Sequence, residues 1–243
     1  MSALSRDITS ADLQRAITTQ AYPDLLEQLV GLSRSTFGFY PASFAYTISY
    51  PWIVSRLNNL PPGSHLLDIG AGVSPVPLFL AKHSIRVDCV DNSKHIRTLP
   101  PTEGWNEWGF LDYGTLHPNL TSHHCDITSF SPKAKFDAIY SIAALAHMPR
   151  IVREKALQLC RNWLQPGGSL FLILDTIPST DFIWNRSEGV EIEAPIQHGT
   201  IDDVANQLRK AGFRMDEFRV MRSIFKSRTD LLFIVCAAMS VSK

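Results

Sequence analysis

Three carboxylates stand at the ends of predicted strands, at Asp68, Asp91 and Asp126. The carboxyl ends of parallel strands meet at one edge of an open α/β sheet, and such sheets bind their ligands there. Asp91 lies about 20 residues beyond the glycine pair Gly70 and Gly72, which is the position of an acceptor for ribose hydroxyls. One such aspartate alone is more often a helix cap or a solvated loop residue. Three in succession predict a nucleoside site.

The glycine turn Gly70-Ala71-Gly72 connects an apolar strand to a predicted helix. Glycine lets the backbone turn tightly and lets a ligand approach the main chain without a Cβ in the way. The amides at the start of the helix then face that ligand. Ser74 is the expected N-cap of this helix, and Pro75 falls in its first turn. A βα turn without a ligand has the same sequence, so the glycines alone do not decide.

His147 is the candidate group for proton transfer, because it follows the fourth predicted strand at the ligand-binding edge. A histidine that only hydrogen-bonds the backbone would suit the same position. His198, in a predicted insert, is a second candidate for contact with a substrate. The run His123-His124-Cys125 is not expected to bind a metal, since adjacent strand residues point to opposite faces. We expect no metal site.

Short apolar runs that alternate with helices indicate βαβ units around a parallel sheet. The fold class is therefore α/β, with helices on both faces and strands at 65–69, 86–91, 122–125, 136–141 and 169–174. A helix is expected over 150–164, and another runs from Thr200, where Asp203 completes a capping box, to Gly212. Runs at 213–225 and 231–238 predict a C-terminal antiparallel hairpin, which brings the mostly parallel sheet to seven strands.

The chain divides into an N-terminal zone and the domain that contains this core. Residues 1–60 show helical periodicity and are expected to form an N-terminal helical lid, whereas residues 61–243 form one compact domain with a loop-like insert at 177–199. Tyr46 and Tyr50 in the lid are candidates for contact with a substrate. Trp108 is a third. It belongs to an aromatic group, interspersed with Glu107 and Asp112, that could wall a pocket for a planar or cationic acceptor: Trp105, Trp108, Phe110 and Tyr113. Ordinary core packing would give the same composition.

The charge balance excludes a broad class of partners. The chain has 23 basic and 23 acidic residues in 243, so it lacks the positive field that nucleic acids or anionic membranes attract. No stretch reaches the length of a membrane span, and the first thirty residues have no apolar leader. Four cysteines without a CxxC pair are expected to be buried thiols in a reducing compartment. We expect a soluble, cytoplasmic protein with no nucleic-acid or membrane partner.

Taken together, these stretches resemble the class I S-adenosylmethionine-dependent methyltransferases. The resemblance covers residues 61–174 well and the C-terminal hairpin more loosely. It is carried by Leu67-Asp68-Ile69-Gly70-Ala71-Gly72, Asp91, Asp126-Ile127, the segment 136–141 followed by His147, and Leu164-Gln165-Pro166-Gly167-Gly168. It implies a Rossmann-like fold, S-adenosyl-L-methionine as cofactor and S-adenosyl-L-homocysteine as product. The chain departs from the family where Ser74 replaces a frequent third glycine and where residues 99–124 form a long, aromatic crossover.

The resemblance also implies roles for single residues. Asp68 with the turn Gly70-Ala71-Gly72 would shape the methionine end of the cofactor site. Asp91, with Asn92, would bind the ribose hydroxyls. The remaining residues would contact the adenine or lie near the sulfonium: Asp126 and Ile127 at the adenine, and Ser141 and Ile142 near the sulfonium, mainly through backbone groups.

The predicted function is in-line methyl transfer to the oxygen or nitrogen of a small molecule by a monomer or homodimer. The neutral charge and the absence of an Asn-Pro-Pro-Tyr-like motif after the fourth strand favour a small acceptor over protein or RNA. A non-catalytic S-adenosylmethionine-binding protein remains an alternative. A nicotinamide-dependent oxidoreductase is less favoured, because the third glycine of its G-x-G-x-x-G pattern would fall at Pro75.

Overall fold

Five parallel strands form the centre of the sheet in the computed structural model of this chain. They run in the order β8-β7-β2-β3-β6. Their bounds are β2 His65–Ile69, β3 Arg86–Asp91, β6 Leu120–His124, β7 Phe136–Ile142 and β8 Leu164–Thr176. The structure describes residues 6–8, 21–41, 46–102, 105–176, 184–185, 192–193, 200–223 and 232–240.

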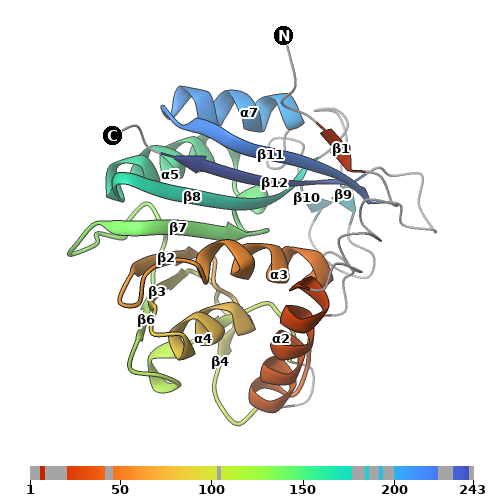
Figure 1. Ribbon diagram of the computed structural model, residues 1–243, viewed down its shortest axis with the longest axis vertical. Helices are drawn as coiled ribbons and strands as arrows, with labels where there is room; N and C mark the ends of the chain where they lie inside the picture. The colour runs from red at the N-terminus through yellow and green to blue at the C-terminus, as the bar shows by residue number, and fades with distance from the viewer. Residues whose placement is uncertain are drawn as a thin grey trace.

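Three more strands extend the sheet beyond β8. The strand β12 (Leu232–Ser240) pairs antiparallel with β8, and β11 (Arg214–Ser223) pairs antiparallel with β12. The short strand β1 (Arg6–Ile8) then pairs in parallel with β11 (Figure 1). The sheet of the described residues therefore has eight strands, and the prediction of seven is wrong. Three residues are too few to show an alternating pattern, so the sequence could not reveal β1.

Helices cover both faces of the sheet. The helices α2 (Ala21–Phe37), α3 (Tyr46–Leu57) and α4 (Pro75–Lys82) share one apolar cluster with Leu66 and Val87 of the sheet. The helices α5 (Arg150–Trp163) and α7 (Ile201–Lys210) share the other cluster with Leu67 and Ile69. Alternate residues of β2 thus face opposite helix layers, which is why this strand is apolar almost throughout.

The connections change face next to β2. The helix α4 leads from β2 to β3 on one face, whereas α5 leads from β7 to β8 on the other. The strands β7 and β2 are neighbours at the centre of the sheet. From β2 the chain continues outward to β3 on one side, and from β7 it continues outward to β8 on the other side. Doubly wound sheets have their ligand crevice at this kind of switch point, outside the carboxyl ends of the strands.

The expected helix caps are confirmed. Ser74 Oγ accepts a hydrogen bond from the Val76 amide at 3.2 Å. Thr200 and Asp203 form the reciprocal capping box of α7. The strand β8 begins earlier than expected, directly after α5, because its Gln165–Gly168 segment forms a bulge against β7 rather than a separate loop.

The N-terminal zone packs into the same core as the sheet. Phe37, Ile53 and Leu57 lie in one apolar cluster with Leu66 and Val76. Short elements occupy the connections: β4 (Ile96–Arg97), β5 (Phe110–Leu111), the 3₁₀ turns η1 (Tyr113–Thr115) and η2 (Leu145–His147), and the pair β9 (Trp184–Asn185) and β10 (Ile192–Glu193). Over the described ranges, no helix combines the length and apolar character that crossing a membrane requires.

Candidate active site

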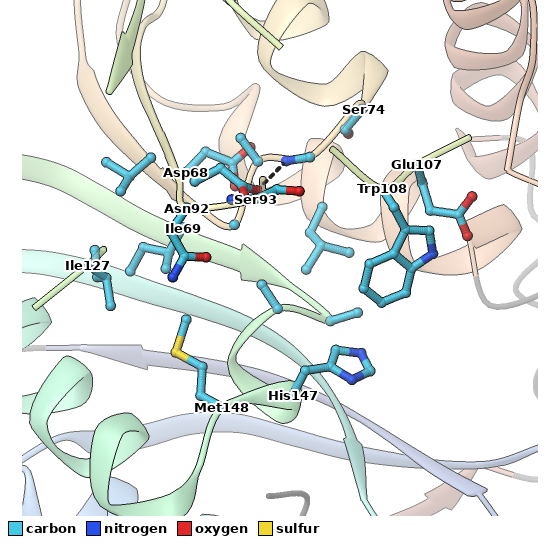
Figure 2. A pocket seen from close by; sticks show the side chains of 18 of the residues that line it. Asp68, Ile69, Ser74, Asn92, Ser93, Glu107, Trp108, Ile127, His147 and Met148 are labelled. Atoms are coloured by element: carbon cyan, nitrogen blue, oxygen red, sulfur yellow. Dashed lines mark hydrogen bonds between the residues drawn. The ribbon is translucent and has the colours of Figure 1, made fainter. Parts of the chain in front are cut away.

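A cavity of about 480 Å³ opens at the carboxyl edge of the sheet, next to β2 and β7. This volume is within the range of small-molecule sites. Figure 2 shows Ile127 and Asn92 toward one end and Glu107, Trp108 and His147 toward the other. The cavity brings together most of the residues predicted for a site: Asp68, Gly70, Ala71, Gly72, Asp91, Asn92, Asp126, Ile127, Ile142, Tyr46, Tyr50, Trp108 and His147.

The glycine turn forms one wall of the cavity in a conformation that requires glycine. Gly70 and Gly72 have φ of 73° and 54°, in the left-handed region. A Cβ at residue 70 would collide with the Cβ of Ala144, and one at residue 72 would stand 2.5 Å from the carbonyl oxygen of Glu107. The glycine turn, Ala144 and Glu107 therefore approach one another more closely than a Cβ at residue 70 or 72 would allow.

Tyr113 holds the glycine turn from behind. Its hydroxyl is fully buried, accepts a hydrogen bond from the Ser74 amide at 2.7 Å and shares its proton between the carbonyls of Ser74 and Gly72 at 3.1 and 3.2 Å. Burial raises the pKa of Tyr113 well above its ordinary value, so the hydroxyl stays protonated. The sequence indicated only an aromatic group in this crossover, not an anchor for the turn.

Asp91 connects the second strand end to the glycine turn. Its Oδ2 accepts the Gly72 amide at 2.9 Å, and its Oδ1 accepts the Ser93 amide at 2.7 Å. Burial raises the pKa of Asp91, while the Ser93 and Gly72 amides oppose the rise. A carboxylate offers about four lone-pair sites, so roughly two remain for a ligand in the cavity.

Asp126 is held in a different way. Its Oδ1 accepts from the Thr128 amide and hydroxyl at 2.8 and 2.6 Å, and its Oδ2 accepts from the Asn92 side chain at 3.1 Å. The Thr128 hydroxyl and amide lower the pKa of Asp126, so it is an anion at neutral pH. Ile127 beside it is buried and supplies an apolar surface to the same end of the cavity.

Asp68 is the most buried of the three acids, with 2% of its surface exposed. Burial raises its pKa well above the ordinary aspartate value, the neighbouring Asp91 carboxylate adds to the rise, and the Tyr140 hydroxyl opposes it. An acid in this environment gains most from a cationic group placed against it.

Two of the predicted residues are not among the described residues that line the cavity. Ser141 is fully buried, and its hydroxyl donates to the Ile69 carbonyl at 2.9 Å and so joins β7 to β2, whereas the contact expected through its backbone stays a prediction. Successive side chains of a strand point to opposite faces of the sheet, and it is Ile142, the next residue, that lines the cavity. His198 lies outside the described residues.

The turn η2 places His147 at the rim of the cavity. Trp108 contacts it with ring centroids 5.5 Å apart and planes at 66° (Figure 2). The buried Arg153 of α5 supports this turn, because it donates to the Leu145 carbonyl at 3.4 Å and to Gln207 of α7 at 2.7 Å. The helices α5 and α7 together therefore fix the backbone that carries His147.

Tyr46 and Tyr50 reach the cavity from α3. Their rings lie 4.9 Å apart, and Tyr50 is 3% exposed. Of the other predicted wall residues, Trp105 packs against the core and Phe110 stacks on His124 at 4.3 Å. The prediction of a pocket wall from the whole aromatic group is therefore met by Trp108 alone.

Several cavity residues were not predicted from the sequence. Ser93, Cys125 and Met148 are among them, whereas Glu107 was expected within the aromatic group. Glu107 also accepts the Val73 amide on its carbonyl at 3.0 Å, which joins the crossover loop to the glycine turn. Cys125 is half-buried rather than buried, which corrects the expectation for that thiol. Only Ser93 had a local signal, as the turn residue two positions after Asp91.

The two adjacent histidines point apart. His123 Nε2 lies 3.7 Å from Asp88, whereas His124 Nε2 lies 2.8 Å from the Ser93 carbonyl. Over the residues that the structure describes, no three His, Cys, Asp or Glu side chains are grouped for a metal ion.

Comparison with known proteins gives a family match in the same region. A family model described as a methyltransferase domain matches residues 66–168. An O-methyltransferase of Pyrenophora dematioidea is 29% identical over 164 residues, which cover 64% of this chain and 56% of that protein. An uncharacterized protein of Rickettsia prowazekii is 27% identical over 161 residues, 59% of this chain and 26% of that protein. The chain thus spans about half or less of these relatives.

Solved structures share the fold. The 1,6-didemethyltoxoflavin-N1-methyltransferase of Burkholderia thailandensis, with 1,6-didemethyltoxoflavin and S-adenosylhomocysteine bound, superposes with a TM-score of 0.53 at 15% identity, over 96% of this chain and 89% of that one. The [4+2]-cyclase SpnF superposes with a TM-score of 0.60 at 14% identity over 100% of both chains. At these identities the likeness shows the fold alone.

Proposed function

We propose that this chain is a class I S-adenosylmethionine-dependent methyltransferase, as the methyltransferase-domain match over residues 66–168 indicates, and that it transfers a methyl group from S-adenosylmethionine to the oxygen or nitrogen of a small molecule. When bound, the cofactor supplies an electrophilic methyl group on a sulfonium whose leaving group is neutral. The protein then contributes mainly alignment, which is worth about 7–11 kcal/mol in well-oriented model reactions.

The residues at the cavity fit this cofactor. The glycine turn leaves main-chain atoms open where a Cβ would otherwise stand. The two lone-pair sites left on Asp91 match a pair of ribose hydroxyls, and the remaining site on Asp126 matches an adenine amine beside Ile127. Asp68 is a buried partner for the ammonium of the methionine moiety, near the turn Gly70-Ala71-Gly72.

At the other end of the cavity, His147 is the candidate general base. It lies within the same cavity as the cofactor residues and is held against Trp108. Tyr46, Tyr50 and Trp108 are the proposed contacts for the acceptor. The helices α2 and α3, within residues 1–60, act as a lid that keeps water from the reacting groups, over a catalytic domain of residues 61–243.

One observation carries this proposal above the others. Asp91 at the end of β3 bonds the Gly72 amide of the turn after β2, and both line the same cavity. A solvated loop acid or a helix cap would not be tied to a neighbouring glycine turn in this way. Asp91 would therefore both hold the glycine turn and bind the nucleoside.

A thermal shift tests the cofactor. At about one hundred times its dissociation constant, S-adenosylmethionine is expected to add about 2.7 kcal/mol to the free energy of unfolding. For a chain of this size that raises Tm by roughly 5–11 °C. A shift with NADH and none with S-adenosylmethionine would support the oxidoreductase instead.

Methyl transfer itself is tested with S-adenosylmethionine labelled in the methyl group. The label is expected to enter a small molecule when the protein is incubated with metabolite extracts. Incorporation into protein or RNA would overturn the small-molecule acceptor. Cofactor binding without transfer to any fraction would leave a non-catalytic binding protein.

A further inference from the structure

The end of the cavity beside His147 has aromatic walls, and we call it the acceptor end. It comprises Tyr46, Tyr50, Glu107, Trp108 and His147. The tyrosine rings lie 4.9 Å apart, and the Trp108 and His147 rings meet edge to face at 5.5 Å. Figure 2 shows Trp108 directed toward His147, with Glu107 on the same side as the indole. Aromatic faces bind flat rings and also attract cations.

The charges at the cavity have one sign. Among the described residues that line it there is neither Lys nor Arg, and its carboxylates are Asp68, Asp91, Glu107 and Asp126. The neighbouring Arg97 is engaged in the crossover loop, where it donates to the Trp108 carbonyl at 3.0 Å and to the Asn106 side chain at 3.3 Å. An acidic or phosphorylated acceptor would therefore lose its hydration without gaining a cationic side chain from the described residues that line the cavity.

Glu107 is the carboxylate of this set that belongs to the acceptor end. Asp91 and Asp126 already bond backbone and side-chain donors near the nucleoside end, and Asp68 lies buried under the glycine turn. The Glu107 carbonyl is fixed by the Val73 amide, so the loop holds this residue and Trp108 in place beside the turn.

We propose that the acceptor is an arylalkylamine, a primary alkylamine that carries an aromatic ring, and that it binds as its ammonium form, with the ring between the aromatic walls and the charge near Glu107. This inference rests on the proposed methyl transfer and names its substrate class. The ammonium gives one proton to the His147 imidazole. The freed nitrogen lone pair then forms the new N–C bond while the S–C bond breaks and its electron pair stays on sulfur. The methylated nitrogen is again positively charged, so Glu107 and the aromatic faces stabilise the product charge as it forms.

Three probes of similar shape test the charge preference. These are 2-phenylethylamine, 2-phenylethanol and 3-phenylpropanoate, each titrated by calorimetry into the full chain saturated with S-adenosylhomocysteine. The amine is expected to bind at least about tenfold more tightly than the carboxylate, with the alcohol between them. Glu107→Gln is expected to reduce the gap between amine and carboxylate while leaving the alcohol unchanged. Glu154→Gln, on the exposed side of α5, is the matched control and should leave all three unchanged.

Each outcome of these titrations supports or overturns a specific part of the proposal. Carboxylate binding as tight as amine binding, tightest binding by the alcohol, or no binding of the amine would overturn the amine proposal while the proposed function stands. A Glu107→Gln variant with an unaltered gap would overturn the role given to that carboxylate. Before the probes are added, S-adenosylhomocysteine is titrated into the chain alone. If it does not bind, the proposed function is overturned and this inference with it.

Discussion

Replacing Asp91 with asparagine removes one charge and almost no volume from the cavity. In the wild-type chain both carboxylate oxygens accept backbone amides, from Gly72 at 2.9 Å and from Ser93 at 2.7 Å. Asparagine has one carbonyl oxygen and one NH₂ group, so only one of these amides keeps its acceptor. The other amide then faces a donor, and the ribose hydroxyls lose the anionic acceptor.

The effect on binding follows from the charged hydrogen bond that the ribose hydroxyls lose. A hydrogen bond to a charged group is worth about 1.5–3 kcal/mol. Asp91→Asn is therefore expected to weaken S-adenosylhomocysteine binding by about 10- to 150-fold. Isothermal titration calorimetry measures this change directly, and circular dichroism of the same samples shows whether the fold is kept.

Asp137→Asn is the matched control. Asp137 also accepts a backbone amide, that of His65 at 2.8 Å, but it lies at the start of β7 beside the first residue of β2, at the edge opposite the cavity. Its replacement should leave the affinity within about twofold of the wild type. Unchanged affinity in Asp91→Asn, or equal loss in both variants, would refute the assignment of Asp91 to the nucleoside.

Three further predictions concern the proton acceptor, the anchor of the glycine turn and the buried acid. His147→Ala should lower kcat by about 10²–10⁴ while the affinity for S-adenosylhomocysteine stays unchanged. The control is His83→Ala at the C-cap of α4, and full activity of His147→Ala would show that no base acts there. Tyr113→Phe leaves the buried Ser74 amide without an acceptor, which should cost about 1–3 kcal/mol and lower Tm by about 2–12 °C in scanning calorimetry; an unchanged Tm would contradict the anchoring role. The raised pKa of Asp68 means that the folded state binds this proton more tightly than the unfolded chain, so its contribution to stability falls as pH rises from the ordinary aspartate value toward the raised pKa. Asp68→Asn should therefore raise Tm at neutral pH, and the gain should shrink as pH falls toward about 3.9; a gain that is constant with pH would contradict the burial argument.

The cofactor end was predictable because its signals are local in the chain. A strand that ends in an acid, a glycine turn and an N-cap follow one another within Asp68–Ser74, and each has its own physical reason. Asp91 and Asp126 follow by the same rule at the next two strand ends. Parallel strands bring these ends to one edge, so the cavity that joins them follows from the order of elements.

The rest depended on contacts between distant segments. Tyr113 reaches the glycine turn from an irregular crossover, and Glu107 meets Val73 through a carbonyl that any residue type would provide. The Ser141 side chain bonds the Ile69 carbonyl of the neighbouring strand, a contact that the motif around Ser141 did not indicate. The edge strand β1 carries too few residues for any periodicity.

The crystal structure of the full chain with S-adenosylhomocysteine is the most direct test of the central claim. The account predicts the ribose hydroxyls on Asp91, the adenine beside Asp126 and Ile127, and the sulfur directed toward the end of the cavity that holds His147. Density for the ligand at any other place, or none at saturating concentration, would contradict it.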